Sequence, residues 1–201
     1  MAKNMEVSQT SNDIRLTYKS IRDGISISER NRLSSLISKN VLALLESDFK
    51  GANIFLCYYP FGSEVDLKQL YSILLQQGKH LYFPKCDKKN HQLYFYEIVD
   101  LEMDFSIGSY NIMEPKSDIN LLTDFNQSII SITPGLIFDK KLNRIGYGGG
   151  FYDRFFEKHP EITSIAPCFS KQLAKTIQIE SHDIPMDYIV TENLVLKGSR
   201  L

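Results

Sequence analysis

The sequence predicts an α/β fold in three layers, with an open, mainly parallel sheet and helices on both of its faces. Strand-like segments alternate with helical segments along the chain, which is typical of a sheet built from crossover connections. The apolar runs are short and bounded by turn residues, as expected for strands that are buried on both sides. The length of 201 residues suits one domain, so we expect residues 1–201 to form a single unit.

Helical segments are recognised by apolar residues at helical spacing and by capping residues. Ile14, Tyr18 and Ile21 follow this spacing in the first segment. Ser28 and Asp66 are residue types that cap helix N-termini, and they are expected to begin the second and third helices. The expected helices are 12–23, 28 to about 45, 66–77 and 151–158, with a further helical turn at 172–176.

Strands are expected where apolar and aromatic residues cluster between turn signals. The predicted strands are 53–59, 80–83, 92–98, 128–132, 164–167 and 188–190. Pro84 is expected to end the second strand, because proline cannot donate a hydrogen bond to a neighbour. The third strand is a candidate hairpin partner of the second. Residues 106–125 are expected to form a loop, since Gly108, Pro115 and several Asp and Asn residues lie there.

Composition narrows the choice of partners. The formal net charge is -1, so the chain has no overall basic field for nucleic acid or an anionic membrane. No apolar run approaches the ~20 residues of a membrane-spanning helix, and residues 1–10 lack the apolar stretch of a signal peptide. Cys57, Cys86 and Cys168 have neither disulfide-framework nor zinc-site spacing. We therefore expect a cytoplasmic protein without nucleic-acid or membrane partners.

A glycine-rich segment in the last third of the chain is the main candidate for chemistry. Residues 146–150 read Gly-Tyr-Gly-Gly-Gly, with four glycines in five positions. Such a backbone can adopt positive φ and turn several N–H groups toward one point, which is how concave loops bind phosphate oxygens. The helix expected to begin at Phe151 would add the positive end of its dipole to the same place.

Charged residues flank this segment and support the same hypothesis. Arg144 and Arg154 could make paired contacts to phosphate, and Asp153 could bind a Mg²⁺ ion that bridges phosphates. The segment is not a P-loop, because Phe151-Tyr152 stands where Lys-Ser or Lys-Thr is needed, and it lacks the third glycine of the dinucleotide fingerprint. The alternative is a glycine-rich surface turn without a ligand.

The stretch from Pro134 to Arg154 resembles the signature of the 5-formyltetrahydrofolate cyclo-ligase family, whose members are also called methenyltetrahydrofolate synthetases. Weaker matches occur in order along the chain at 14–15 with 22, 61–65, 83–85, 112–115, 182–185 and 191–192. Two positions depart from the family pattern. Ser11 stands where the family usually has a lysine before the helix arginine, and Leu142 stands where it tends to have glycine, so the turn before Arg144 should differ slightly.

The resemblance implies a Rossmann-like fold of the NagB/RpiA/CoA transferase type and ATP-dependent closure of 5-formyltetrahydrofolate to 5,10-methenyltetrahydrofolate. ATP would be the co-substrate, Mg²⁺ the cofactor and the protein a monomer. The implied ATP-binding residues are Arg15, Arg144, Gly146, Tyr147, Gly148, Gly149, Gly150 and Asp153. The implied folate-binding residues are Glu64 and Tyr152, the metal ligands Asp153 and Asp183, and the catalytic residues Arg144 and Tyr152.

Each of these residues also has a purely structural alternative. Arg15 and Arg22 could be exposed helix charges, and Glu64 could be a solvated loop carboxylate. Tyr152 could fill the core, Asp153 could favour the helix start and Asp183 could belong to an ordinary turn. Two other functions stay open: a related ATP-dependent ligase for a different formyl or amide substrate, and a protein that binds folate or nucleotide without turnover.

Overall fold

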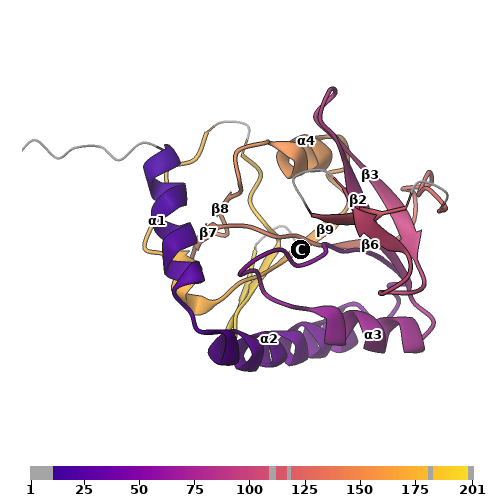
Figure 1. The fold of residues 1–201 in the computed structure, drawn as a ribbon, viewed down its shortest axis with the longest axis horizontal. Coiled ribbons are helices and arrows are strands. Elements are labelled where there is room, and N and C mark those ends of the chain that lie inside the picture. The colour runs from indigo at the N-terminus through magenta and orange to yellow at the C-terminus, as the bar shows by residue number, and fades with distance from the viewer. Residues whose placement is uncertain (1–10, 109–111, 117–118, 181–182, 199–201) are drawn as a thin grey trace, which may run out of the picture.

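The computed structural model describes residues 11–108, 112–116, 119–180 and 183–198, which form a sheet between helical layers (Figure 1). Helices α2 (Ile27–Asp48) and α3 (Lys68–Gln76) cover one face, at the bottom of the figure. Helix α4 (Phe151–Lys158) lies on the opposite face, and α1 (Ser11–Asp23) stands beside a small second sheet. The predicted three-layer α/β fold is confirmed.

Seven strands form the main sheet in the order β12-β11-β9-β6-β1-β2-β3. Their bounds are Ile54–Leu56 for β1, His80–Asp87 for β2, Gln92–Ile98 for β3, Ile129–Ile132 for β6, Thr163–Pro167 for β9, Tyr188–Val190 for β11 and Val195–Lys197 for β12. The five strands from β11 to β2 are parallel, and an antiparallel strand closes each edge.

The direction of the strand order reverses between β1 and β6. The chain adds β2 on one side of β1 and later returns to place β6 on the other side. In open α/β sheets, ligands bind outside the carboxyl ends of the strands at such a reversal, because the loops that follow the two strands diverge and leave a crevice. Glu64 lies in the connection after β1, and the segment 134–150 follows β6, so both reach this edge.

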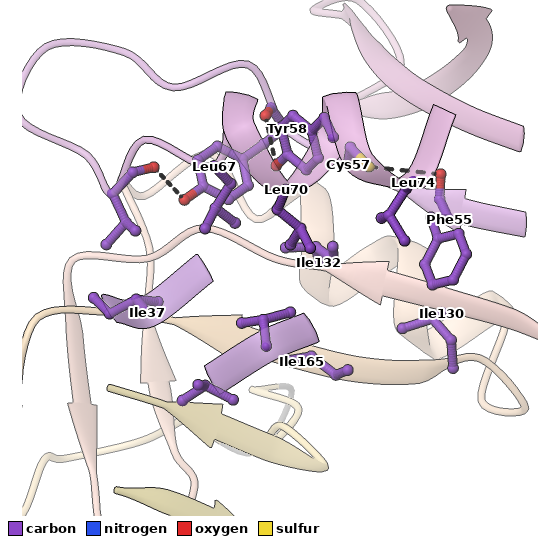
Figure 2. Close-up of a cluster of buried hydrophobic side chains, with 14 of the residues drawn as sticks. Ile37, Phe55, Cys57, Tyr58, Leu67, Leu70, Leu74, Ile130, Ile132 and Ile165 are labelled. Carbon is purple, nitrogen blue, oxygen red and sulfur yellow. Dashed lines mark hydrogen bonds between the residues drawn. The ribbon is translucent and has the colours of Figure 1, made fainter. Parts of the chain in front are cut away.

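Alternating side chains of the strands supply two cores. Phe55 of β1 joins the helices α2 and α3, whereas its neighbours Ile54 and Leu56 face the layer that contains α4. Figure 2 shows the first core, where Ile37 of α2 and three leucines of α3 and its N-cap pack against three parallel strands. The residues labelled there are Ile37, Phe55, Cys57, Tyr58, Leu67, Leu70, Leu74, Ile130, Ile132 and Ile165.

Two small sheets complete the fold. The first has the order β10-β7-β8, with β7 at Ile137–Asp139, β8 at Arg144–Ile145 and β10 at Leu173–Ala174. It carries the glycine-rich segment, which follows β8 directly. The second pairs β4 (Phe105–Ile107) with β5 (Met113–Pro115), so the predicted loop at 106–125 is wrong in this part.

Several predicted boundaries are wrong. Ser26 rather than Ser28 caps α2, and its hydroxyl accepts from the Glu29 N–H. Leu67 is the N-cap of α3, while the Asp66 carboxylate accepts from the Lys68 N–H just outside the helix. β2 continues through Pro84 to Asp87, because its pairing with β1 ends at Tyr82 and the rest of the strand pairs with β3.

The predicted hairpin of the second and third strands is confirmed by the antiparallel pairing of β2 with β3. The predicted helical turn at 172–176 is displaced: a 3₁₀ turn, η2, spans Ser170–Gln172 and β10 follows it. Strands β7, β8 and β12 were not expected. Within the part of the chain that the structure describes, every helix is too short or too polar to traverse a lipid bilayer.

Candidate active site

The glycine-rich segment forms a loop between β8 and α4, as expected. Gly148 has φ 95° and Gly150 has φ 64°, so both lie in the left-handed region that only glycine adopts readily. Gly150 is the N-cap of α4, and the chain enters the helix from this left-handed residue. A side chain at Gly146 would also bring its Cβ to 2.8 Å from Nη1 of Arg144.

Leu142 takes a glycine-like conformation in the turn before Arg144. Its φ is 69°, so the leucine itself occupies the left-handed region. The buried carboxylate of Asp139 holds this turn, because Oδ1 accepts from the N–H groups of Lys141 and Asn143 at 2.9 and 3.1 Å. The contacts of Asp139 thus support a left-handed backbone at Leu142, a conformation that glycine adopts more readily.

Arg144 lies at the centre of the candidate site and is buried. Its Nη2 donates to Oδ1 of Asp153 at 2.9 Å, and its Nη1 lies 3.5 Å from the carbonyl oxygen of Pro134. The guanidinium carbon is 5.6 Å from the ring centroid of Tyr152, within the range of a cation–π contact. The fold thus brings together Arg144, Tyr152 and Asp153. The Nε of Arg144 is buried and has no acceptor among the described residues.

Helix α1 reaches the same loop from the other side. Nε of Arg15 donates to the carbonyl oxygen of Gly146 at 3.1 Å. Ile14 and Tyr18 pack against a cluster of Leu136, Ile137 and Ile145 in the small sheet, and this contact fixes the orientation of the helix. The alternative that Arg15 is merely an exposed helix charge is therefore wrong. Nothing is described for the side chain of Ser11, at the helix start.

Glu64 is bound by the loop and by α1 together. The hydroxyl of Tyr147 donates to Oε1 of Glu64, and Nη2 of Arg22 donates to the same hydroxyl at 2.9 Å. Nη1 of Arg22 lies 3.9 Å from Oε1 of Glu64. The Glu64 side chain is only 8% exposed, so the alternative of a solvated loop carboxylate is wrong.

Sequence inspection missed a second layer behind this contact. Nε of Arg22 donates to Oγ of Ser63 at 2.9 Å, and Ser63 in turn donates to Asp23. Arg22 is 2% exposed, so its reading as a surface charge is wrong. The spacing of Arg15 and Arg22 offered a signal, because residues seven apart in a helix lie on one face.

Burial controls the charges at the site. It raises the pKa of Glu64 above its ordinary value, while the hydrogen bond from Tyr147 and the charge of Arg22 oppose the rise. Burial likewise raises the pKa of the Tyr152 phenol, which therefore stays neutral as a donor or a packing surface. Burial also raises the pKa of Cys86 to about 11, so this cysteine is a neutral thiol and a poor nucleophile.

The two candidate metal ligands have different surroundings. Asp153 holds Arg144, and its side chain is 17% exposed. Oδ2 of Asp183 accepts from the Glu180 N–H at 2.7 Å, and the Asp183 N–H donates to the Glu180 carbonyl oxygen at 3.1 Å, as in an ordinary turn. Across the described ranges no three His, Cys, Asp or Glu side chains form a metal cluster. Residues 181–182 lie outside the described part.

Two cavities are lined by residues that contact the loop. One of about 330 Å³ is lined by Glu64 together with the starts of α2 and α3. Another of about 220 Å³ lies between β3 and α4, and Phe151 and Arg154 form part of its wall. Each cavity is thus connected to the loop through one side chain, Glu64 in the first and Arg154 in the second.

The fold and the site together define an α/β protein with a glycine loop at the strand-order reversal, next to a buried arginine and a buried carboxylate. A family model described as the 5-formyltetrahydrofolate cyclo-ligase family matches residues 7–192. The chain belongs to the 5-formyltetrahydrofolate cyclo-ligase family, and the expected assignment as a ligase is confirmed.

Individual relatives agree with this assignment. A 5-formyltetrahydrofolate cyclo-ligase of Haemophilus influenzae is 28% identical over 182 residues, which cover 89% of this chain and 95% of that protein. A protein of the same name from Mus musculus is 25% identical and covers 93% and 96% of the two chains.

A solved NMR structure, the 5,10-methenyltetrahydrofolate synthetase of Aquifex aeolicus, superposes with a TM-score of 0.80 at 27% identity, over 94% of this chain and 93% of that one. A second synthetase structure, from Mycoplasma pneumoniae, shares the fold with a TM-score of 0.73 at 19% identity and covers 92% and 99% of the two chains.

Proposed function

We propose that this chain uses ATP to cyclise 5-formyltetrahydrofolate to 5,10-methenyltetrahydrofolate, with release of ADP and phosphate. The observation that supports this most is the convergence of Arg144, Arg15 and Glu64 on one glycine loop, contributed by three separate parts of the chain. Family membership supports the reaction, and this convergence supports the glycine loop as its site.

The chemistry needs the formyl oxygen converted into a leaving group. That oxygen attacks the γ-phosphorus of ATP, the bond from this phosphorus to the bridging oxygen breaks, and ADP leaves. The aminobenzoyl nitrogen then attacks the formyl carbon and loses its proton. Finally the C–O bond breaks, phosphate leaves and the methenyl cation remains. Phosphoryl transfer of this kind needs positioning and charge neutralisation more than covalent help from the protein.

The chain provides such groups around the loop. Gly146 to Gly150 would offer backbone N–H groups to the phosphates, and Arg15 would approach from α1. Arg144 would neutralise charge on the transferred group. Its Nε has no acceptor among the described residues, and a buried unpaired donor costs about 1–3 kcal/mol. A phosphate oxygen at this position would remove that cost.

A Mg²⁺ ion, when bound, would neutralise charge on the phosphates of ATP. Mg²⁺ is commonly held by one or two carboxylates together with substrate phosphates, so a full cluster of protein ligands is not required. Asp153 fits such a role, because its carboxylate lies beside the loop and is partly exposed. Asp183 remains the second ligand in this proposal.

The folate would lie beside the loop. Glu64 is the residue for the aminopyrimidinone edge of the pterin, since a carboxylate accepts paired N–H donors there. Tyr147 donates to this carboxylate in the structure, so its hydroxyl marks a direction from which a donor can approach. Tyr152 would contact the pterin or the formyl group, and its ring already packs against Arg144.

The test is turnover of 5-formyltetrahydrofolate by the purified protein, followed as growth of the methenyl chromophore. ATP, Mg²⁺ and the folate are each omitted in turn, and ADP is measured in parallel. We expect product only when ATP and the folate are both present. Folate binding without ADP formation would refute the proposal in favour of a binding protein.

The cellular context belongs to the same proposal. A cytoplasmic location is supported by the three cysteines, all of which are free thiols, as is usual in a reducing compartment. The monomeric state is proposed with it. Sedimentation of the purified protein tests the monomer directly.

A further inference from the structure

The cavity between β3 and α4 has no role in the chemistry above. Its volume of about 220 Å³ is below the range of about 300–1,000 Å³ for pockets that enclose a whole drug-sized ligand. It therefore suits one arm of a larger molecule. The floor is apolar and aromatic, formed by Leu93, Phe95, Leu122, Phe125 and Phe155.

The rim of this cavity is cationic. Arg154 and Lys158 lie four residues apart on α4, so both project from the same face of the helix, and both are exposed. Arg154 donates only to backbone carbonyl oxygens, and Lys158 has no hydrogen bond or ion pair within the described ranges. No Asp or Glu lines the cavity. The aromatic floor favours an aryl group, and the two cations favour carboxylates. The cavity therefore suits a ligand that carries both.

Two residues of the cavity wall, Phe151 and Arg154, adjoin the glycine loop. Nη2 of Arg154 donates to the Gly149 carbonyl oxygen, and its Nε lies 3.4 Å from the carbonyl oxygen of His91 in the β2–β3 turn. Phe151 is the first residue of α4 and also a wall of the cavity, where the His91 ring lies 5.8 Å from its ring. A molecule that reacts at the loop can thus extend one arm into the cavity.

We propose that this cavity binds the aminobenzoylglutamate arm of the folate, with the aryl ring over the aromatic floor and the glutamate carboxylates at Arg154 and Lys158. The proposal rests on the folate activity assigned above and adds the part of the substrate that this chain distinguishes. Additional glutamates on the substrate would follow the same cationic rim.

Turnover of two substrates tests this: 5-formyltetrahydrofolate and 5-formyltetrahydropteroate, which lacks the glutamate. The measured quantity is the ratio of their kcat/KM values. In Lys158→Gln this ratio should fall by about threefold, the size of one exposed charge pair. In the same variant, the ratio should fall further when a triglutamate substrate replaces the monoglutamate. At high salt, where exposed charges are screened, the wild-type ratio should approach that of the variant.

Two further variants separate a specific effect from a general one. Lys158→Arg keeps the charge and should retain the wild-type ratio. Lys39→Gln removes a comparable exposed lysine from α2, on the opposite face of the sheet, and should also leave the ratio unchanged. An unchanged ratio in Lys158→Gln would overturn the cavity assignment, whereas no turnover of either substrate by the wild type would instead refute the proposed function.

Discussion

Among single residues, Arg144 has contacts to Asp153, to Pro134 and to the ring of Tyr152. Lysine at this position keeps the charge but loses the planar fork that makes several directed hydrogen bonds. We expect Arg144→Lys to lower kcat by about a hundredfold, the typical effect of removing one donor that stabilises developing charge. Steady-state kinetics with ATP and 5-formyltetrahydrofolate measure this.

The control for this variant is Arg32→Lys. Arg32 makes an ion pair with Glu29 on the surface of α2, where the arginine side chain is 60% exposed. The kcat of Arg32→Lys should equal that of the wild type. A kcat near normal in Arg144→Lys would show that this residue serves only to hold α4.

Glu64 links the site to pH. Its folded-state pKa is raised by burial, so the folded chain binds more protons than the unfolded chain at pH values above the ordinary pKa of 4.5. The stability that protonated Glu64 contributes is present below pH 4.5 and is lost as pH rises through the raised pKa. As pH rises from 4.5 through the raised pKa, the free energy of unfolding of Glu64→Gln should therefore increase relative to that of the wild type. Urea titration at several pH values measures this.

The matched variant is Glu29→Gln. The pKa of Glu29 is lowered, mainly by the hydrogen bond from Arg32. The stability that ionised Glu29 contributes is therefore present above pH 4.5 and is lost as pH falls through the lowered pKa. Parallel stability curves for Glu64→Gln and the wild type between pH 4.5 and 8 would contradict an elevated Glu64 pKa.

At the scale of elements, the glycine loop is set by its fit to Arg144. A Cβ at Gly146 would lie 2.8 Å from Nη1 of Arg144, the mobile end of a long side chain. The backbone can therefore stay in place while the guanidinium shifts from Asp153. We expect Gly146→Ala to reduce kcat by about a hundredfold, the effect of a displacement of about 1 Å. The melting temperature should change little.

Gly51→Ala provides the comparison for the loop variant. A Cβ at Gly51 meets no atom within 4 Å, so this variant should retain activity and change stability by no more than about 0.5 kcal/mol. If Gly146→Ala instead lost activity and also melted at a much lower temperature, the loop would have collapsed.

Elements with strong local signals were predictable from the sequence. The glycine loop, the helix at 151–158 and the hairpin at 92–98 rest on composition or spacing within a few residues, and the structure contains all three. Strands β8 and β10 have two residues each, too few for any periodicity. They exist because partners distant in sequence pair with them.

The candidate site was predictable in part for the same reason. The glycines and Arg144 are neighbours in sequence, and the family resemblance added Arg15 and Glu64. The contacts of Arg22 to Ser63 and Tyr147 span 41 and 125 residues, and such distances leave no local pattern. Ser26 and Ser28 are equally good caps by type, so only the backbone geometry distinguishes them.

At the scale of the whole molecule, two cores share the same strands. Ile129 and Ile130 are neighbours in β6, yet Ile129 faces the core with α4 and Ile130 faces the core with α2 and α3. Each is nearly fully buried, so Ile129→Ala and Ile130→Ala should each lower the free energy of unfolding by about 2–5 kcal/mol. Urea unfolding followed by far-UV and near-UV circular dichroism measures both.

These two variants also test whether residues 1–201 form one domain. Because the cores are joined through every central strand, we expect a single transition, shifted to lower urea in both variants. Two separate transitions, with only one of them shifted in each variant, would show that the layers unfold independently.

The strand order has a consequence for synthesis on the ribosome. β1 lies inside the sheet, β2 and β3 extend it in one direction, and β6, β9, β11 and β12 then extend it in the other. Each strand therefore finds its neighbour already translated when it leaves the exit tunnel. A nascent chain can assemble this sheet outward from its first strand without waiting for a later segment to be inserted between two earlier ones.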